Sequence, residues 1–167
     1  MVLTKDELIA SLHNEVRILL HLATKVDPSK LDYRPTPKQR STIELLRYMS
    51  IMGPGLAQAA VDGGFDPVKW TAAVEEAGKG GFDHTVAVIA AQPDRFDAIL
   101  GPLADDDFRT HIEMFGRRAT LGQFFVNTVL AGYAAYRTQL FNYLKAGGRE
   151  ELSTMNLWAG MDAAPPA

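Results

Sequence analysis

Three Ser or Thr residues, each followed three positions later by Glu or Gln, stand directly before long stretches in which apolar residues recur at helical spacing. The pairs are Thr4 with Glu7, Ser41 with Glu44, and Thr120 with Gln123. In such a capping box the hydroxyl accepts a hydrogen bond from a backbone amide of the first helical turn, and the longer side chain accepts one from the amide of the cap residue. Three helix starts of this kind predict a chain built mainly of long helices.

The apolar periodicity also predicts where the helices lie. We expect long helices near residues 5–25, 42–62, 82–101 and 120–146. Proline lacks the amide proton of a helical hydrogen bond, so Pro54 predicts a kink or break in the second helix and Pro93 a bend or split in the third. A short helix is expected after Asp66, and alternating apolar and polar residues predict a short extended segment at 108–114.

The order of these elements predicts the fold class, an all-α, up-and-down four-helix bundle with a short extra helix and a short extended segment in its connections. With 167 residues the chain is long enough to bury roughly two thirds of its unfolded surface. No repeat or low-complexity tract divides it. We expect one domain over residues 1–160 and a disordered tail at 161–167.

Composition narrows the class of partner. The chain has 17 basic and 20 acidic residues and a formal charge of −3, so it has no basic field for nucleic acid. It contains no cysteine, which excludes disulfides, thiolate zinc sites and cysteine nucleophiles. The N-terminus carries acidic residues where a signal peptide needs its apolar core, and no run approaches the roughly 18 apolar residues of a membrane span. We therefore expect a cytoplasmic protein without nucleic-acid or membrane partners.

Two charged residues interrupt apolar helix faces. Arg137 lies in the middle of the apolar stripe of the last helix, and Glu15 lies on the apolar face of the first. A buried charge is costly unless it is paired, so one interpretation is a buried Glu15–Arg137 pair, joined by the hydroxyls of Tyr48 and Tyr136, that fixes helix register. The alternatives are a small pocket in which Arg137 binds an anionic ligand, and a catalytic role for Tyr136 or Glu15.

The segments LDYRPTPKQRSTIELLRYMS and VLAGYAAYRTQLFNYLKAGG resemble the DinB/YfiT-like superfamily of four-helix bundles, in which a proline-containing connector leads into a Ser-capped second helix. The resemblance covers nearly the whole chain. It implies a bundle fold, a frequent dimeric state and, in many members, a divalent metal that is held by three histidines and activates a small thiol cofactor. The matching positions here are Tyr48, Gly132 and Tyr136. We therefore expect no metal at the family site and no cofactor.

The four histidines of the chain show no helical metal-binding pattern such as HxxxH or HExxH. We expect His13 to be a hydrogen-bonded residue at the edge of the core, and His21 to lie on a solvent-exposed face of the first helix. The preferred interpretation is a non-catalytic bundle that binds a small ligand or another protein. The alternative is a metal-dependent thiol-using transferase or isomerase with a relocated site formed by His13, Glu15 and Glu44.

Apolar residues outside the expected core suggest an assembly. Ile18, Ile43 and Phe124 would be partly exposed on a lone bundle, so we expect a homodimer. Near the C-terminus, Leu157 and Trp158 are expected to dock on the bundle or across the dimer seam. In the proline-containing connector, Arg34 and Arg40 are either solvated or paired with acidic residues of the C-terminal region.

Overall fold

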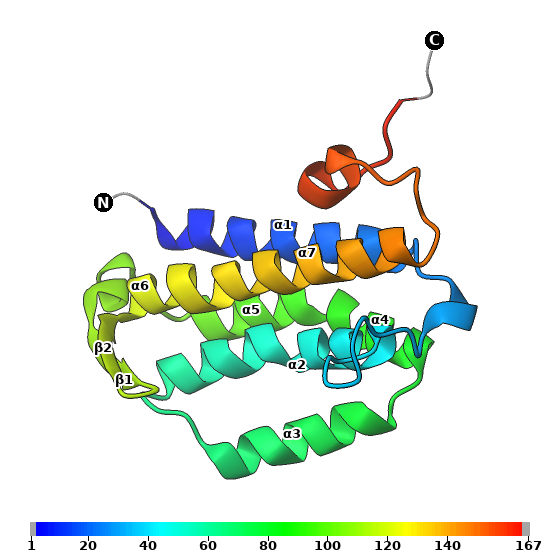
Figure 1. The fold of residues 1–167 in the computed structure, drawn as a ribbon. Coiled ribbons are helices and arrows are strands. Elements are labelled where there is room, and N and C mark those ends of the chain that lie inside the picture. The colour runs from blue at the N-terminus through cyan, green and yellow to red at the C-terminus, as the bar shows by residue number, and fades with distance from the viewer. Residues whose placement is uncertain (1–2, 165–167) are drawn as a thin grey trace.

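The computed structural model describes residues 3–164 and shows a helical bundle (Figure 1). Its helices are α1 (Lys5–Ala23), α2 (Thr42–Val61), α3 (Pro67–Lys79), α4 (Phe82–Ala90), α5 (Gln92–Leu100), α6 (Leu121–Phe124) and α7 (Ala131–Ala146). Helices α1, α2 and α7 pack together with the α4–α5 pair, and α3 lies outside the bundle against α2. The all-α, four-helix-bundle fold class is confirmed.

The capping boxes define the helix starts that were expected from them. Thr4 accepts from the amide of Glu7, whose carboxylate accepts from the Thr4 amide in return, and Ser41 and Glu44 form the same reciprocal pair. Thr120 accepts from the amide of Gln123. These contacts satisfy amides that have no partner within the helix, so each helix begins at the residue after its cap.

Pro54 lies inside α2 without ending it. Because proline has no amide proton, the carbonyl of Ser50 lacks its helical donor, and Gln92 supplies one from α5. The Gln92 Nε2 atom lies 2.9 Å from the carbonyl oxygens of both Met49 and Ser50. The hydroxyl of Tyr133 donates to Gln92 Oε1 over 2.6 Å, and the side chains of both residues are fully buried. The helix therefore continues past its proline.

Pro93 has the other expected effect. The third long helix is split into α4 and α5 at Ala91, and Pro93 occupies the first turn of α5, where its missing amide costs nothing. The short helix after Asp66 is also present, since the Asp66 carboxylate accepts from the amides of Val68 and Lys69 at the start of α3.

The extended segment is shorter than expected and belongs to a hairpin. Strand β1 (His111–Met114) pairs antiparallel with β2 (Arg117–Thr120), and residues 105–109 form a 3₁₀ turn instead. The second strand was not predicted, because its turn is Phe115-Gly116 rather than the Asn-Gly typical of two-residue hairpins. Both turn residues have positive φ, 52° for Phe115 and 72° for Gly116.

The last helix is not uniform. Between α6 and α7 it widens into a π-helical segment from Phe125 to Leu130. Phe125 and Val129 are buried in this segment, whereas Val126 and Asn127 face solvent. The whole stretch from Leu121 to Ala146 still acts as one bundle element, as the sequence predicts for 120–146.

Three residues expected at a dimer seam are part of the interior. Ile18, Ile43 and Phe124 are 1%, 8% and 5% exposed in the single chain. The prediction that these three side chains are partly exposed on a single bundle is therefore wrong. The homodimer stays a prediction that depends on the family resemblance.

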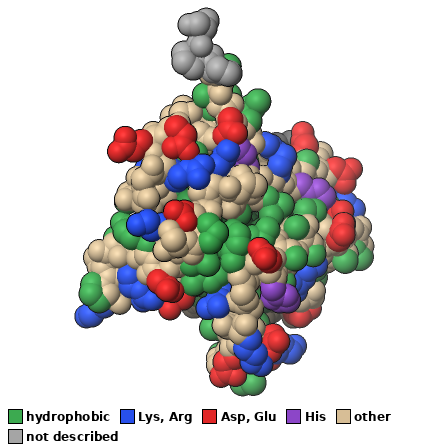
Figure 2. All heavy atoms as spheres, turned by 90° about the vertical axis from the view of Figure 1, so that its right-hand side faces the viewer, with side chains coloured by type: hydrophobic (Ala, Val, Ile, Leu, Met, Phe, Trp, Pro, Cys, Tyr) green, Lys and Arg blue, Asp and Glu red, His purple; other side chains and the backbone are tan. Residues whose placement is uncertain are grey.

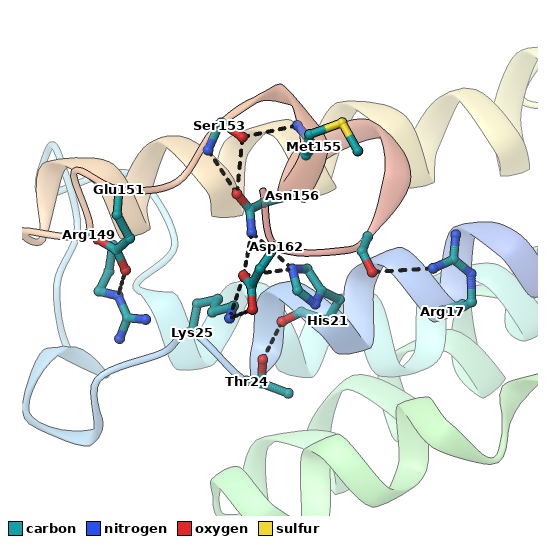
Figure 3. A network of polar contacts seen from close by, with 11 residues as sticks. Arg17, His21, Thr24, Lys25, Arg149, Glu151, Ser153, Met155, Asn156 and Asp162 are labelled. Carbon is teal, nitrogen blue, oxygen red and sulfur yellow. Dashed lines mark hydrogen bonds and ion pairs between the residues drawn. The ribbon is translucent and has the colours of Figure 1, made fainter. Parts of the chain in front are cut away.

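Residues 152–162, which we call the C-terminal segment, cover one face of α1 (Figure 3). Arg17 donates to the carbonyl of Ala159 over 2.9 Å, and Asp162 forms an ion pair with Lys25 at 2.7 Å. The Nδ2 atom of Asn156 lies 3.0 Å from the ring nitrogen of His21. Arg17 is exposed as expected for this face, whereas His21 is half-buried because the segment packs over it. Of the tail expected to be disordered, residues 165–167 lie outside the described part of the chain.

The surface carries no field of one sign on the face seen in Figure 2, where Lys and Arg alternate with Asp and Glu around a central group of hydrophobic side chains. This agrees with the formal charge of −3. Within residues 3–164, no helix is both long enough and apolar enough to span a lipid bilayer.

Candidate functional site

Arg137 connects three elements of the bundle. It is 4% exposed, and its Nε atom lies 3.1 Å from Glu15 Oε2 on α1. Its Nη2 atom donates to Glu15 Oε1 over 3.3 Å, and its Nη1 atom donates to the carbonyl of Leu157 in the C-terminal segment. Each guanidinium nitrogen therefore faces a partner among residues 3–164, so the charge of Arg137 is compensated within the bundle.

The Glu15–Arg137 pair is electrostatically costly. Burial raises the pKa of Glu15 above its ordinary value, and the attraction of Arg137 opposes this shift without reversing it. Such a pair adds little net stability, but either charge left alone would be strongly unfavourable. The arrangement is typical of a buried pair that fixes the position of the helices and of the C-terminal segment.

Trp158 stands beside this pair and is largely exposed. Its ring centroid lies 5.7 Å from the Arg137 guanidinium, and 70% of the residue is accessible to solvent. It forms one wall of a groove of about 570 Å³ between α1 and α7. The expectation that Trp158 is buried on the bundle is therefore wrong for the single chain, whereas Leu157 is partly buried.

Tyr48 and Tyr136 do not join the Arg137 network. Their rings meet edge to face with centroids 5.0 Å apart, and the guanidinium of Arg40 lies 4.0 Å from the Tyr48 centroid. Burial, assisted by the neighbouring Tyr136, raises the pKa of Tyr48 to about 12, so its phenol stays protonated at neutral pH. Arg34 pairs with Glu44 at 3.1 Å. Among the ion pairs of residues 3–164, none joins Arg34 or Arg40 to an acidic residue of the C-terminal region.

The three residues that the resemblance matches to metal ligands, Tyr48, Gly132 and Tyr136, do not offer the donors that a divalent metal prefers. A side chain at Gly132 would begin 3.2 Å from the thioether of Met52, which fills this space. The remaining donors are the phenols of Tyr48 and Tyr136, whereas the divalent metals of such sites prefer imidazole and carboxylate. Across residues 3–164, no three His, Asp or Glu side chains gather into a metal-binding group.

The proposed members of a relocated metal site are each engaged elsewhere. His13 contacts Asp97 of α5, with 2.9 Å between Nε2 and Oδ1. Glu15 pairs with Arg137, and Glu44 serves the Ser41 cap and Arg34. The structure therefore does not bring His13, Glu15 and Glu44 together.

A hollow of the surface lies where α2, α3 and α5 meet. We call this cavity of about 590 Å³ the α3 pocket. Its apolar lining includes the rings of Phe65 and Trp70, whose centroids are 5.5 Å apart. Trp70 also contacts Tyr48 edge to face, at 6.1 Å, which holds the indole in place. The amino-acid sequence alone does not reveal this site, because its residues come from three elements and form no motif.

In the α3 pocket the acidic side chains have partners within the protein, whereas the basic side chains do not have one among residues 3–164. Asp62 accepts from Gln58 Nε2 over 2.8 Å, and Asp66 caps α3. Lys69 and Arg95 line the same pocket, yet neither forms an ion pair or a side-chain hydrogen bond with any residue in 3–164. Two cations are thus available to a ligand, while the neighbouring carboxylates are occupied.

Comparisons with known proteins support the fold. No protein-family profile matches the chain, and no curated protein is similar to it. A solved structure of a DinB-like protein from Bacillus subtilis, YjoA, superposes with a TM-score of 0.66 over 87% of this chain and 95% of that one. The two sequences are 16% identical, so this likeness shows the fold alone. The chain therefore has a DinB-like fold.

Proposed function

We propose that this protein binds a small amphipathic anion in the α3 pocket, and that it does so without the metal site of the DinB-like enzymes. The observation that carries the proposal is that two cations, Lys69 and Arg95, which have no side-chain partner among residues 3–164, line the same cavity as the aromatic rings of Phe65 and Trp70. A cavity of about 590 Å³ lies within the usual range of small-molecule sites.

The lining indicates the chemistry of the ligand. Guanidinium and ammonium groups bind carboxylate, and Arg95 offers the planar fork that matches its two oxygens. The aromatic rings, together with Ile51 and Ile99, favour an apolar or flat body. A carboxylate with an alkyl or aryl body satisfies both requirements.

The rival interpretation, a metal-dependent thiol-using transferase, needs a different set of donors. Tyr48, Gly132 and Tyr136 do not supply them. Elemental analysis of protein purified without added metal tests the rival directly. Stoichiometric nickel, zinc or iron that is lost on substitution of His13 or Glu15 would favour the enzyme over the binding protein.

Tryptophan fluorescence tests the proposed binding. In a Trp158→Phe background Trp70 is the remaining tryptophan, and we expect octanoate and benzoate to change its emission saturably, while octylamine does not. Arg95→Gln and Lys69→Gln should each weaken carboxylate binding about tenfold, the effect of losing one charge-assisted contact of ~1.4 kcal/mol.

Lys79→Gln is the matched control, because Lys79 lies on α3 but pairs with Glu76 at 2.6 Å. It should leave the affinity unchanged. The absence of saturable binding by either carboxylate, or equal losses in Lys79→Gln and Lys69→Gln, would contradict the proposal.

A further inference from the structure

We propose that a second site, between the β-hairpin and the start of the last helix, binds a small organic phosphate. This hollow of about 430 Å³, which we call the hairpin pocket, is lined by both strands and by α6 and the π-helical segment. It shares no lining residue with the α3 pocket and does not depend on the function proposed there.

The charge of the hairpin pocket has one sign. Arg117 and Arg118 line it, and no acidic residue does. Glu113 lies opposite Arg118 in the strand register, but neither arginine forms an ion pair with a carboxylate of residues 3–164. Two exposed guanidinium groups beside one cavity favour an anion of higher charge than a monocarboxylate, and guanidinium forks match phosphate oxygens in pairs.

Three polar side chains on the helix side of the cavity are also unused. Gln123, Asn127 and Thr128 line the pocket, and among the side-chain hydrogen bonds of residues 3–164 none involves their amide or hydroxyl groups. Together with the two guanidinium groups, these side chains can bind both the phosphoryl oxygens and the hydroxyl groups of a polar organic body. The aromatic rings of Phe115 and Phe124 add an apolar wall.

The backbone around this cavity departs from regular geometry on both sides. Asn127 and Thr128 belong to the π-helical segment, and such segments are frequent at functional sites. On the hairpin side, Phe115 has a φ of 52°, a conformation that costs a non-glycine residue energy and that clusters at ligand sites. These two features occur independently and meet at the same pocket.

Isothermal titration calorimetry on the full chain tests the site with inorganic phosphate, glycerol 3-phosphate and adenosine 5′-monophosphate. Succinate serves as a dicarboxylate and ribose as an uncharged sugar. We expect the phosphate esters to bind more tightly than succinate and ribose not to bind. The double variant Arg117→Gln/Arg118→Gln should lose at least tenfold in affinity, and Asn127→Ala about threefold.

The matched control is Arg109→Gln, since Arg109 is an exposed arginine just before the hairpin that faces Asp106 at 3.8 Å. It should leave phosphate affinity unchanged. Because the Asn127 side chain is exposed and forms no hydrogen bond with residues 3–164, Asn127→Ala keeps the test open if the double variant does not fold. The proposal is overturned if no phosphate compound binds, if succinate binds as tightly as the esters, or if Arg109→Gln weakens binding as much as the double variant.

Discussion

Arg137 and Arg95 show how differently one side chain is used in two regions of this molecule. Arg137 is buried between α1, α7 and the C-terminal segment, and every one of its nitrogens faces a partner. Arg95 is exposed at the edge of the α3 pocket and has no such partner among residues 3–164. The interior of the bundle thus contains polar groups that satisfy one another, whereas the surface cavities contain polar groups that a ligand can satisfy. The residue that is conspicuous in the sequence belongs to the first group.

Removing the buried guanidinium is expected to have the largest effect. Arg137→Met should lower the free energy of unfolding by roughly 3–5 kcal/mol, because it leaves the Glu15 carboxylate buried without its partner charge. Arg95→Met is the matched control, and as an exposed substitution it should stay within about 0.5 kcal/mol of wild type. Urea denaturation measures both. If both variants lost the same free energy of unfolding, the buried and the exposed arginine would not differ in their contribution to stability.

A double-mutant cycle sharpens the same contrast. Glu15→Leu combined with Arg137→Met should recover much of the loss, since a buried pair replaced by apolar side chains leaves no charge unpaired. A coupling energy below about 0.5 kcal/mol would show that Arg137 acts mainly through Leu157.

A second interior contact should follow Arg137 in magnitude. Gln92→Leu leaves the carbonyls of Met49 and Ser50 without the donor that replaces the missing Pro54 amide, and we expect a loss of roughly 2–3 kcal/mol. Tyr133→Phe removes one hydroxyl from the same network and should cost about 1–2 kcal/mol. If Gln92→Leu proved neutral in thermal and urea unfolding, α2 would not need a side chain to continue past its proline.

The C-terminal segment is intermediate between the buried interior and the exposed cavities. It covers His21, which lies close to charged side chains. Burial, and then the nearby Lys25, lower the pKa of His21, while Asp162 opposes the shift and Arg17 adds to it. The folded state therefore disfavours protonated His21, so the stabilising contribution of neutral His21 is complete above 6.5 and is lost as pH falls below that value.

Hydrogen exchange measures this loss in residues 155–162. We expect faster exchange at about pH 5.5 than at about pH 7.5, after correction for the intrinsic rate. His21→Gln, which cannot be protonated, should lose the pH dependence. A pH dependence that persists in this variant would assign it to another group.

The sequence was informative where a residue conflicts with its surroundings. Thr4 and Ser41 predicted helix starts because a capping side chain acts on amides only two or three residues away. Pro93 predicted a split for the same local reason. Glu15 and Arg137 could be matched because each is a charge on an apolar face and their signs are opposite.

The sequence was uninformative where the partner is backbone or an unremarkable surface residue. The C-terminal segment is held partly by Arg17 on the carbonyl of Ala159, and a carbonyl has no sequence signature. For this reason the α1 face that carries Arg17 and His21 looked like a solvent-exposed one. Lys69 and Arg95 likewise resemble any exposed cation until the fold brings them to one cavity. An exposed binding residue does not interrupt the apolar face of a helix, so the sequence pattern does not single it out.

The smallest effect concerns the surface, at the tip of the hairpin. The positive φ of Phe115 costs about 1–2 kcal/mol for an ordinary L-residue, while the ring packs on Phe65 at 5.0 Å and near Phe124 at 6.5 Å. Phe115→Asn relieves the strain, because asparagine tolerates this conformation before glycine, but it loses aromatic contacts of about 0.5–1.5 kcal/mol each. The two changes should nearly cancel, within about 0.5 kcal/mol in urea denaturation. Phe115→Ala separates them, since alanine keeps the strain and loses the contacts, and it should be less stable than Phe115→Asn by about 1 kcal/mol. Equal stability of the two variants would mean that the turn is not strained, and the hairpin pocket would lose one of its two backbone anomalies.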